Sequence, residues 1–310
     1  MKNFWYKLKK PIIALAPMAG YTDSAFRLVC KQMGADVVYS EMISVDGICF
    51  KNQKTLKMLE FNKKECPVIF QLFGSKPENF AKAIQIINSK FPNFQIPKLP
   101  IGIDINFGCP ARKVAKTGSG AALMNELDKA YEIIKTVCDN TSLPISVKIR
   151  TKVKNTTCLD FVEKIKNLPI SAIMIHGRTL NQGFTGEIDY EIIQKVKQIL
   201  PEKIIIANGD VNIQSDISNI LKKTQADGLG IARGALGNPW IFKQQVPSLA
   251  QKRQVILKHA QLFLKNNQNL IPLRKHLVHY AKGQKNASAL RQRIIRVKTF
   301  DDLKKILIKN

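Results

Sequence analysis

The residues best suited to chemistry in this chain follow short apolar runs, one group after each of eight runs. In chain order these groups are APMAGYTD, YSEM, FQLFG, INFGCP, VKIR, IHGRT, ANGD and GIARGALGNPW. They place a thiol, an ammonium group, an imidazole and several amides at equivalent points of successive units. A glycine or thiol after one strand is ordinary, but packing alone does not predict such a residue after every strand. The pattern indicates an active site built from many strand ends.

Cys109 is the strongest single candidate for catalysis, because it lies within the NFGCP segment at residues 106–110. A thiol can protonate a carbanion or enolate and return as the thiolate. The remaining cysteines show no CxxC or zinc-type spacing, so we expect neither a disulfide framework nor a metal site. These are Cys30, Cys49, Cys66, Cys138 and Cys158.

The eight apolar runs alternate with helical patterns. Their hydrophobicity is continuous, which indicates strands buried on both faces, as in a parallel sheet covered by helices. Eight such units predict an α/β fold of the (β/α)₈ TIM barrel type, whereas a doubly wound sheet usually has fewer strands. In such a barrel the chemistry lies after the strand ends. The expected strands are Ile12–Ala16, Val37–Ser40, Val68–Leu72, Gly102–Asn106, Ile145–Ile149, Ala172–Ile175, Ile204–Ala207 and Gly228–Ile231.

The charge of the chain is strongly positive, at +26, and is concentrated near the C-terminus. Residues 241–310 hold 16 Lys and Arg against two acids, Asp301 and Asp302. This segment has helical patterns and no strand pattern. We therefore expect a catalytic barrel at 1–245 and a small, basic, all-helical domain at 246–310. The charge excess indicates a polyanionic partner such as nucleic acid, although a general preference for Lys would also contribute.

A signal peptide, a membrane-spanning segment and a dinucleotide-binding motif are not expected. The start of the chain lacks the unbroken apolar region of a signal peptide, and no apolar run approaches a membrane span, so we expect a cytoplasmic protein.

Gly118-Ser119-Gly120 begins like a dinucleotide fingerprint, but it lacks the third glycine and does not follow a strand directly.

Taken together, the strand-end motifs resemble those of the tRNA-dihydrouridine synthases, flavin-dependent enzymes that reduce uridine in tRNA. The resemblance runs from about Ile13 to Lys305, and RKHLVHYAKG at 274–283 is similar to the bacterial B-type branch. It implies FMN as cofactor, NADPH or NADH as a transient electron donor, and a D-loop uridine of tRNA as substrate. A monomer is expected.

The resemblance also implies which residues hold the flavin. A flavin needs an apolar face, a cation near its pyrimidine edge and N–H groups for its phosphate. Lys148 would stabilise the anionic reduced ring, and the loops after the seventh and eighth strands would bind phosphate. Ala232 stands where the family usually has Gly, so a positive φ there would be strained. The implied contacts are Pro17, Met18, Ala19, Gln71, Lys148, His176, Asn208, Gly209, Asp210, Ala232 and Arg233.

For the substrate, the resemblance implies that Cys109 protonates carbon 5 of the uracil while the flavin delivers hydride to carbon 6. Asn106 would hydrogen-bond the flipped base. Leu180 replaces a frequent Arg, and His279 replaces a usual Trp. Further substrate contacts are expected from Arg178, Lys113, Lys116, Arg274, Lys275 and Arg291.

Two other functions fit part of the sequence. Another FMN-dependent barrel oxidoreductase acting on a small molecule, similar to dihydroorotate dehydrogenase, would explain the flavin residues and the cysteine but not the basic tail. A non-catalytic RNA-binding protein on a retired barrel would explain the tail, but Cys109 and Lys148 are retained.

Overall fold

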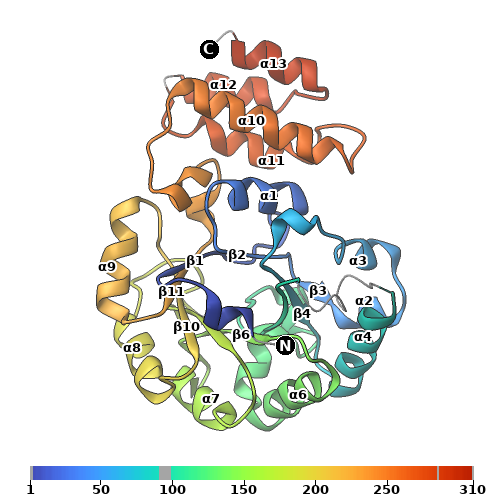
Figure 1. The fold of residues 1–310 in the computed structure, drawn as a ribbon, viewed down its shortest axis with the longest axis vertical. Helices are drawn as coiled ribbons and strands as arrows, with labels where there is room; N and C mark the ends of the chain where they lie inside the picture. The colour runs from blue at the N-terminus through green and yellow to red at the C-terminus, as the bar shows by residue number, and fades with distance from the viewer. Residues whose placement is uncertain (1–2, 91–98, 285, 309–310) are drawn as a thin grey trace.

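The computed structural model describes residues 3–90, 99–284 and 286–308, and its centre is a closed parallel barrel of eight strands (Figure 1). The strands pair in chain order, and β2 bonds directly to β4, which leaves no open edge. The expected TIM barrel is confirmed, and no strand end differs from the expectation by more than one residue. The strands are β1 (Ile12–Leu15), β2 (Val37–Tyr39), β4 (Val68–Phe73), β5 (Ile101–Asn106), β6 (Ile145–Arg150), β9 (Ala172–His176), β10 (Ile204–Asn208) and β11 (Gly228–Ile231).

A ring of helices surrounds the strands (Figure 1). Side-chain caps start several of them: Asp23 accepts the N–H of Phe26 at the start of α1, and Thr157 with Asp160 forms a capping box on α7. The ring helices are α1 (Ser24–Gln32), α2 (Val45–Cys49), α3 (Gln53–Lys57), α4 (Pro77–Lys90), α6 (Leu127–Asn140), α7 (Cys158–Ile165), α8 (Tyr190–Ile199) and α9 (Gln214–Thr224).

The segment after β2 differs from the expectation. The sequence predicts one helical stretch near 55–59, whereas the structure has the two short helices α2 and α3. Gly47 lies within α2, where its low helix propensity weakens the sequence pattern. A Cβ at this glycine would lie 2.6 Å from the Oγ1 of Thr55, so glycine permits the close packing of α2 on α3.

Short elements complete the barrel. The 3₁₀ turn η1 places Phe4 and Trp5 across the end where the strands begin, where they join the apolar cluster that fills the interior. Among the described residues, this packing leaves that end of the barrel filled. The short elements are η1 (Phe4–Lys7), β3 (Ile43–Ser44), η2 (Lys63–Glu65), α5 (Arg112–Ala115), η4 (Gly120–Asn125), β7 (Lys152–Val153), β8 (Thr156–Thr157), η5 (Arg233–Ala235) and η6 (Pro239–Lys243).

The C-terminal segment is a group of helices beyond α1 (Figure 1). Its apolar core includes Ala25 from α1 and Trp240 from η6, so the segment packs firmly on the barrel. As far as the structure describes residues 241–308, they contain no strand. The helices are α10 (Leu249–Leu264), α11 (Arg274–Leu277), η7 (Val278–Ala281), α12 (Ala287–Ile294) and α13 (Phe300–Ile308).

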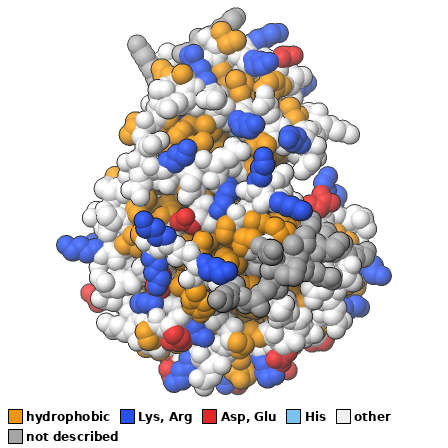
Figure 2. Space-filling view, viewed as in Figure 1, with side chains coloured by type: hydrophobic (Ala, Val, Ile, Leu, Met, Phe, Trp, Pro, Cys, Tyr) orange, Lys and Arg blue, Asp and Glu red, His pale blue; other side chains and the backbone are white. Residues whose placement is uncertain are grey.

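The surface carries Lys and Arg side chains on both parts of the molecule. Figure 2 shows them scattered over the visible face of the barrel and over the helical segment, where acidic side chains are scarce. This distribution agrees with the excess of basic residues after Trp240. Within the described ranges, no helix has the length and apolar character needed to cross a membrane.

Candidate active site

A cavity of about 610 Å³ lies at the end of the barrel where the strands finish. The candidate catalytic residue, every expected cofactor contact and Asn106 all line it. The structure therefore brings together residues that are separated by up to 216 positions in the chain, from Pro17 to Arg233. They are Pro17, Met18, Ala19, Gln71, Asn106, Cys109, Lys148, His176, Asn208, Gly209, Asp210, Ala232 and Arg233.

The floor of the cavity contains two hydrogen-bonded amides from neighbouring strands. Nδ2 of Asn106 donates to Oε1 of Gln71 at 2.8 Å. Oδ1 of Asn106 accepts the backbone N–H of Cys109 at 2.9 Å and that of Gly108 at 3.1 Å. Asn106 therefore fixes the backbone of the loop that carries the thiol.

Cys109 is half-buried and has a free thiol. Its carbonyl accepts the N–H of Ala121 at 3.2 Å. A Cβ at Gly120, whose φ is +64°, would lie 3.2 Å from the Cβ of Cys109. Gly120 thus allows η4 to pack directly behind Cys109, which accounts for this glycine without a dinucleotide.

Lys148 lies in β6, with its Nζ 3.1 Å from Oδ1 of Asn208 on β10. Burial, and next the charge of Arg150, lowers the pKa of Lys148 to about 8, although Asp104 and Cys109 act in the opposite direction. The side chain is therefore mainly cationic at neutral pH but can lose its proton under mildly alkaline conditions. Such a cation can stabilise negative charge that develops inside the cavity.

His176 is surrounded by cations. Burial lowers its pKa to about 2, with further lowering from Lys148, Arg150, Arg178 and Arg233, so the imidazole is neutral. The cavity wall holds the cations Lys148, Arg150 and Arg233, and Asp210 is its single acidic side chain among the described residues. This uncompensated positive charge suits an anionic ligand.

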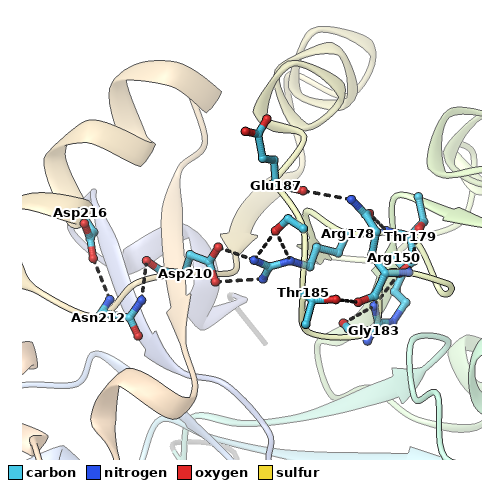
Figure 3. Close-up of polar contacts among 11 residues, drawn as sticks. Arg150, Arg178, Thr179, Gly183, Thr185, Glu187, Asp210, Asn212 and Asp216 are labelled. Atoms are coloured by element: carbon cyan, nitrogen blue, oxygen red, sulfur yellow. Dashed lines mark hydrogen bonds and ion pairs between the residues drawn. The ribbon is translucent and has the colours of Figure 1, made fainter.

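Arg178 does not line the cavity, although the sequence suggests a substrate contact. It is 3% exposed, and its guanidinium forms a two-point ion pair with Asp210, including an Nη1–Oδ1 hydrogen bond of 2.9 Å (Figure 3). Its Nη2 and Nε also donate to the carbonyl of Gly186, at 2.7 and 3.0 Å. Arg178 therefore joins the loops after β9 and β10, and both carboxylate oxygens of Asp210 are paired with it.

Arg150 is a lining residue that the sequence analysis did not select. It donates to the carbonyl of Gly108 at 2.8 Å. It also donates to the carbonyls of Thr179 at 2.9 Å and Gly183 at 3.0 Å (Figure 3). It thereby ties the Cys109 loop to the loop after β9. The available signal is its spacing, because residues two apart on a strand face the same side and Lys148 is a predicted flavin contact.

The ring of Phe184 was also missed. It lies on the cavity wall, 56% exposed, with its centroid 4.7 Å from the guanidinium carbon of Arg233 and 5.9 Å from that of Arg150. Nothing in the local pattern distinguishes this loop phenylalanine from an ordinary exposed residue. Its position depends on the fold of the whole 177–188 loop.

The loops after β10 and β11 meet where Gly234 packs against Val211. Gly209 has a φ of +132°, and a Cβ at Gly234 would collide with the carbonyl of Val211. Ala232, by contrast, has a φ of −106°, so the positive φ considered from the sequence is absent and alanine is accommodated without that strain. Backbone from both loops therefore approaches the cavity closely beside Arg233.

The other expected substrate contacts lie outside the cavity wall. Lys113 and Lys116 are exposed in the α5 region that follows Cys109, and Arg291 is exposed on α12. Lys275 is exposed, with Nζ 5.6 Å from the ring centroid of Tyr21. Arg274 is half-buried, and its Nε donates to the carbonyl of Val297 at 2.6 Å.

The other two departures from the family pattern, Leu180 and His279, have different surroundings. Leu180 is half-buried against the main core, and its N–H donates to the carbonyl of Lys152. His279 reaches the cavity wall from η7, in edge contact with Tyr21 at a centroid distance of 5.9 Å. The described part of the chain contains no group of three or more His, Cys, Asp or Glu side chains that could hold a metal ion.

Comparison with known proteins agrees with the motifs and the fold. A family model described as dihydrouridine synthase matches residues 14–309. A probable tRNA-dihydrouridine synthase of Helicobacter pylori is 38% identical over 297 residues, which is 92% of this chain and 87% of that protein. The tRNA-dihydrouridine synthase B of Pasteurella multocida is 36% identical over 303 residues, which is 93% of this chain and 88% of that one.

Similar solved structures share the fold at low identity. A histamine dehydrogenase from Rhizobium has a TM-score of 0.55 and 11% identity, with coverage of 86% of this chain and 49% of that one. A morphinone reductase in complex with tetrahydroNAD has a TM-score of 0.53 and 9% identity, with coverage of 80% and 92%. The sequence matches are much closer, and they extend over nearly the whole chain. The chain therefore belongs to the dihydrouridine synthase family, and its similarity to B-type members agrees with the branch that its C-terminal motif predicts.

Proposed function

We propose that the protein is an FMN-dependent tRNA-dihydrouridine synthase. It would reduce uridine in the D-loop of tRNA to 5,6-dihydrouridine, with NADPH or NADH as electron donor. The observation that carries this proposal is the cavity itself, where a free thiol and a hydrogen-bonding amide lie within a wall that is positively charged. The family match and the basic surface support an RNA substrate rather than a small molecule.

The residues present fit a flavin mononucleotide. Pro17, Met18 and Ala19 offer apolar and backbone contacts for the ring, and Lys148 offers a cation for its pyrimidine edge. The uncompensated cations around His176 and the close glycine backbone beside Arg233 suit a phosphate dianion. When bound, the flavin supplies the hydride that is added to carbon 6 of the uracil.

Cys109 supplies the matching proton. As the C5=C6 double bond becomes single, Sγ of Cys109 gives its proton to carbon 5 and remains as a thiolate, which is reprotonated from water. Asn106 holds both the base and the cysteine loop in place, since one side of its amide binds the backbone of Gly108 and Cys109. Arg150 restrains the same loop through the carbonyl of Gly108.

The domain division at residue 245 is part of this proposal. Residues 1–245 would bind the cofactor and perform the reduction, and residues 246–310 would bind tRNA through phosphates. The exposed cations Lys113, Lys116, Lys275 and Arg291 would hold the RNA while the target uridine is flipped into the cavity. Flipping costs a few kcal/mol, which phosphate contacts can offset.

The function can be tested in two steps. The purified protein should be yellow and should release FMN rather than FAD when denatured; a protein that stays colourless after incubation with FMN contradicts the flavin assignment. Mass-spectrometric mapping of tRNA from a strain lacking this protein should show dihydrouridine missing from the D-loop and restored by a plasmid copy. Unchanged dihydrouridine in that strain, together with no turnover of tRNA by purified protein, would contradict the RNA substrate.

A further inference from the structure

A carboxylate is buried below the floor of the cavity. Asp104 on β5 is fully buried, and it lies between Ile103 and Ile105, which belong to the core outside the barrel. Because side chains alternate along a strand, Asp104 and Asn106 face the barrel interior together. The cavity does not include Asp104, so the mechanism above gives it no direct contact with substrate or cofactor.

A continuous chain of hydrogen bonds leads from this carboxylate to the catalytic loop. Nε2 of Gln71 donates to Oδ2 of Asp104 at 2.8 Å, and Oγ of Ser146 donates to Oδ1 at 2.6 Å. Gln71 accepts from Asn106 through Oε1, and Asn106 accepts the backbone N–H of Cys109 through Oδ1. Each step is at most 2.9 Å long, so Asp104 and the Cys109 backbone are connected through two side-chain amides.

The chemistry at both ends fixes the orientation of both amides. The N–H of Cys109 can only donate, so the oxygen of Asn106 must face it. An ionised carboxylate can only accept, so the nitrogen of Gln71 must face Asp104. The middle bond then has one possible direction, from Asn106 to Gln71. Turning either amide would place two donors or two acceptors against each other at a buried site, which is costly.

This arrangement determines what Asn106 can offer to a ligand. Its oxygen is occupied by two backbone N–H groups, and one hydrogen of Nδ2 is used by Gln71. The second hydrogen of Nδ2 has no other partner among the residues that the structure describes. Since Asn106 lines the cavity, it can present a donor there and no readily available acceptor.

We propose that Asp104 is a positioning residue that holds Gln71 and, through it, Asn106 in the orientation that presents an N–H donor to a carbonyl oxygen of the substrate base. This rests on the proposed function. Uracil has carbonyl oxygens at both positions 2 and 4, whereas cytosine has an amino group at position 4. Such a donor can therefore bind either carbonyl oxygen of uracil, whereas cytosine offers only the one at position 2.

The surroundings of Asp104 agree with this role. Burial raises its pKa to about 6, while the hydrogen bonds from Ser146 and Gln71 and the charge of Lys148 act in the opposite direction. The group is therefore mainly a carboxylate, and thus an acceptor, at neutral pH. A buried charge of this kind is costly to the fold unless it is well bonded, so its role in the site gives a reason for its presence.

Three variants distinguish the effect of losing the hydrogen-bond acceptor of Asp104 from the effects of losing its charge and of disturbing the fold. Asp104→Asn removes the charge but keeps an oxygen for Gln71, because the hydroxyl of Ser146 can turn and accept from the new amide. Asp104→Leu removes the acceptor. Ser146→Ala is the control, since it removes the other hydrogen bond to the same carboxylate and leaves Gln71 bonded.

Two measurements are made on each protein as purified. The first is hydrogen exchange of the Gly108 and Cys109 backbone amides, followed by NMR with ¹⁵N-labelled glycine and cysteine. The second is kcat/KM for tRNA. We expect Asp104→Leu to accelerate exchange at both amides and to lose roughly tenfold to a hundredfold in kcat/KM, as for a buried polar group left unpaired. Asp104→Asn and Ser146→Ala should stay within a few-fold of wild type in both.

Other results overturn the proposal. Unchanged exchange and kcat/KM in Asp104→Leu would show that Asp104 does not hold the amides. Equal losses in Asp104→Asn and Asp104→Leu would show that the charge acts instead, and equal losses in Ser146→Ala would indicate a general structural role. If Asp104→Leu does not fold, Asp104→Val, which is smaller than Leu and also lacks an acceptor for Gln71, takes its place in the same comparisons. Failure of the proposed function is distinguishable, because wild-type protein would then not turn over tRNA while the exchange pattern remained.

Discussion

Nε2 of His276 lies 3.5 Å from a carboxylate oxygen of Asp23, and this pair connects the helical segment to the loop that follows β1. The other oxygen of Asp23 accepts the N–H of Phe26 at the start of α1. Burial raises the pKa of Asp23, but the nearby imidazoles of His276 and His259 and the N–H of Phe26 outweigh it and lower the pKa to about 2. The helical segment is thus joined to the barrel by a polar contact as well as by its apolar core.

Asp23→Asn should weaken this junction without removing the helix cap, because Asn is as good an N-cap as Asp. We expect a loss of about 1 kcal/mol in the free energy of unfolding at pH 7, since the Asp23 side chain is one-quarter exposed. Urea unfolding measures it. Ser24→Ala, which removes the adjacent hydroxyl bonded to Glu65, is a control that leaves the pair intact.

The same variant should change the pH dependence of stability. The folded pKa of Asp23, about 2, is below the unfolded value of about 3.9, so its contribution is complete above pH 4 and is lost as pH falls toward 2. Wild type should therefore lose more stability than Asp23→Asn between pH 4 and pH 2. Parallel stability curves for the two proteins in that range would contradict the low folded pKa.

Cys109→Ala should separate flavin chemistry from reduction of the base. The variant should keep bound FMN and oxidation of NADPH, because the thiol is needed only for the proton. Reduction of tRNA should fall by roughly 10²–10⁴-fold, the usual contribution of a positioned proton donor. Cys138→Ala on α6 should behave like wild type, and normal tRNA turnover by Cys109→Ala would show that another group supplies the proton.

Lys148 should give an alkaline limit to flavin reduction. Its lowered pKa of about 8 means that the ammonium form is present below that pH and is lost as pH rises through it. The rate of NADPH-dependent flavin reduction should therefore fall above about pH 8 in wild type. Lys148→Met should reduce the flavin more slowly below pH 8, should show no fall in rate above pH 8 and should bind FMN more weakly in titrations. Lys152→Met, a change of an exposed lysine on β7, should keep the fall in rate above pH 8. A fall in rate above pH 8 that persists in Lys148→Met would contradict the attribution of this pH dependence to Lys148.

Arg178 and Lys275 should respond oppositely to two measurements. Arg178→Ala breaks the ion pair with Asp210 and should cost about 2 kcal/mol of stability, a value moderated by the 37% exposure of the Asp210 side chain. It should not change the salt dependence of tRNA affinity. Lys275→Ala should leave stability unchanged but reduce the slope of log affinity against log salt by about 0.7 to 0.9, as expected for one lost phosphate contact. A reduced slope in Arg178→Ala would instead support the direct RNA contact suggested by the sequence.

Much of the fold follows from local sequence patterns. The buried strands are continuous Ile- and Val-rich runs, and the motif residues at their ends meet because all eight strands of a closed barrel point the same way. The strand pattern alone therefore predicts that Lys148, His176 and Asn208 share one cavity. The family resemblance then assigned chemistry that spacing alone does not give.

What the sequence did not predict depends on contacts between distant segments. Arg178 looks like a free cation in HGRT, but its environment is decided by Asp210, 32 residues later. Asp104 lies in an apolar run, and its role becomes visible only when β4 places Gln71 beside it. Phe184 reaches the cavity through the course of a loop, which has no simple periodicity.

His279 has a consequence for how members of such a family can diversify. Because η7 carries this imidazole to the cavity wall, the segment that would choose the RNA also forms part of the reaction chamber. A chimera that grafts the helices of a relative onto this barrel would also change the wall of the chamber. The C-terminal helical segment therefore cannot be exchanged independently of the barrel. A change in the RNA that it binds would have to evolve together with the residues that line the cavity.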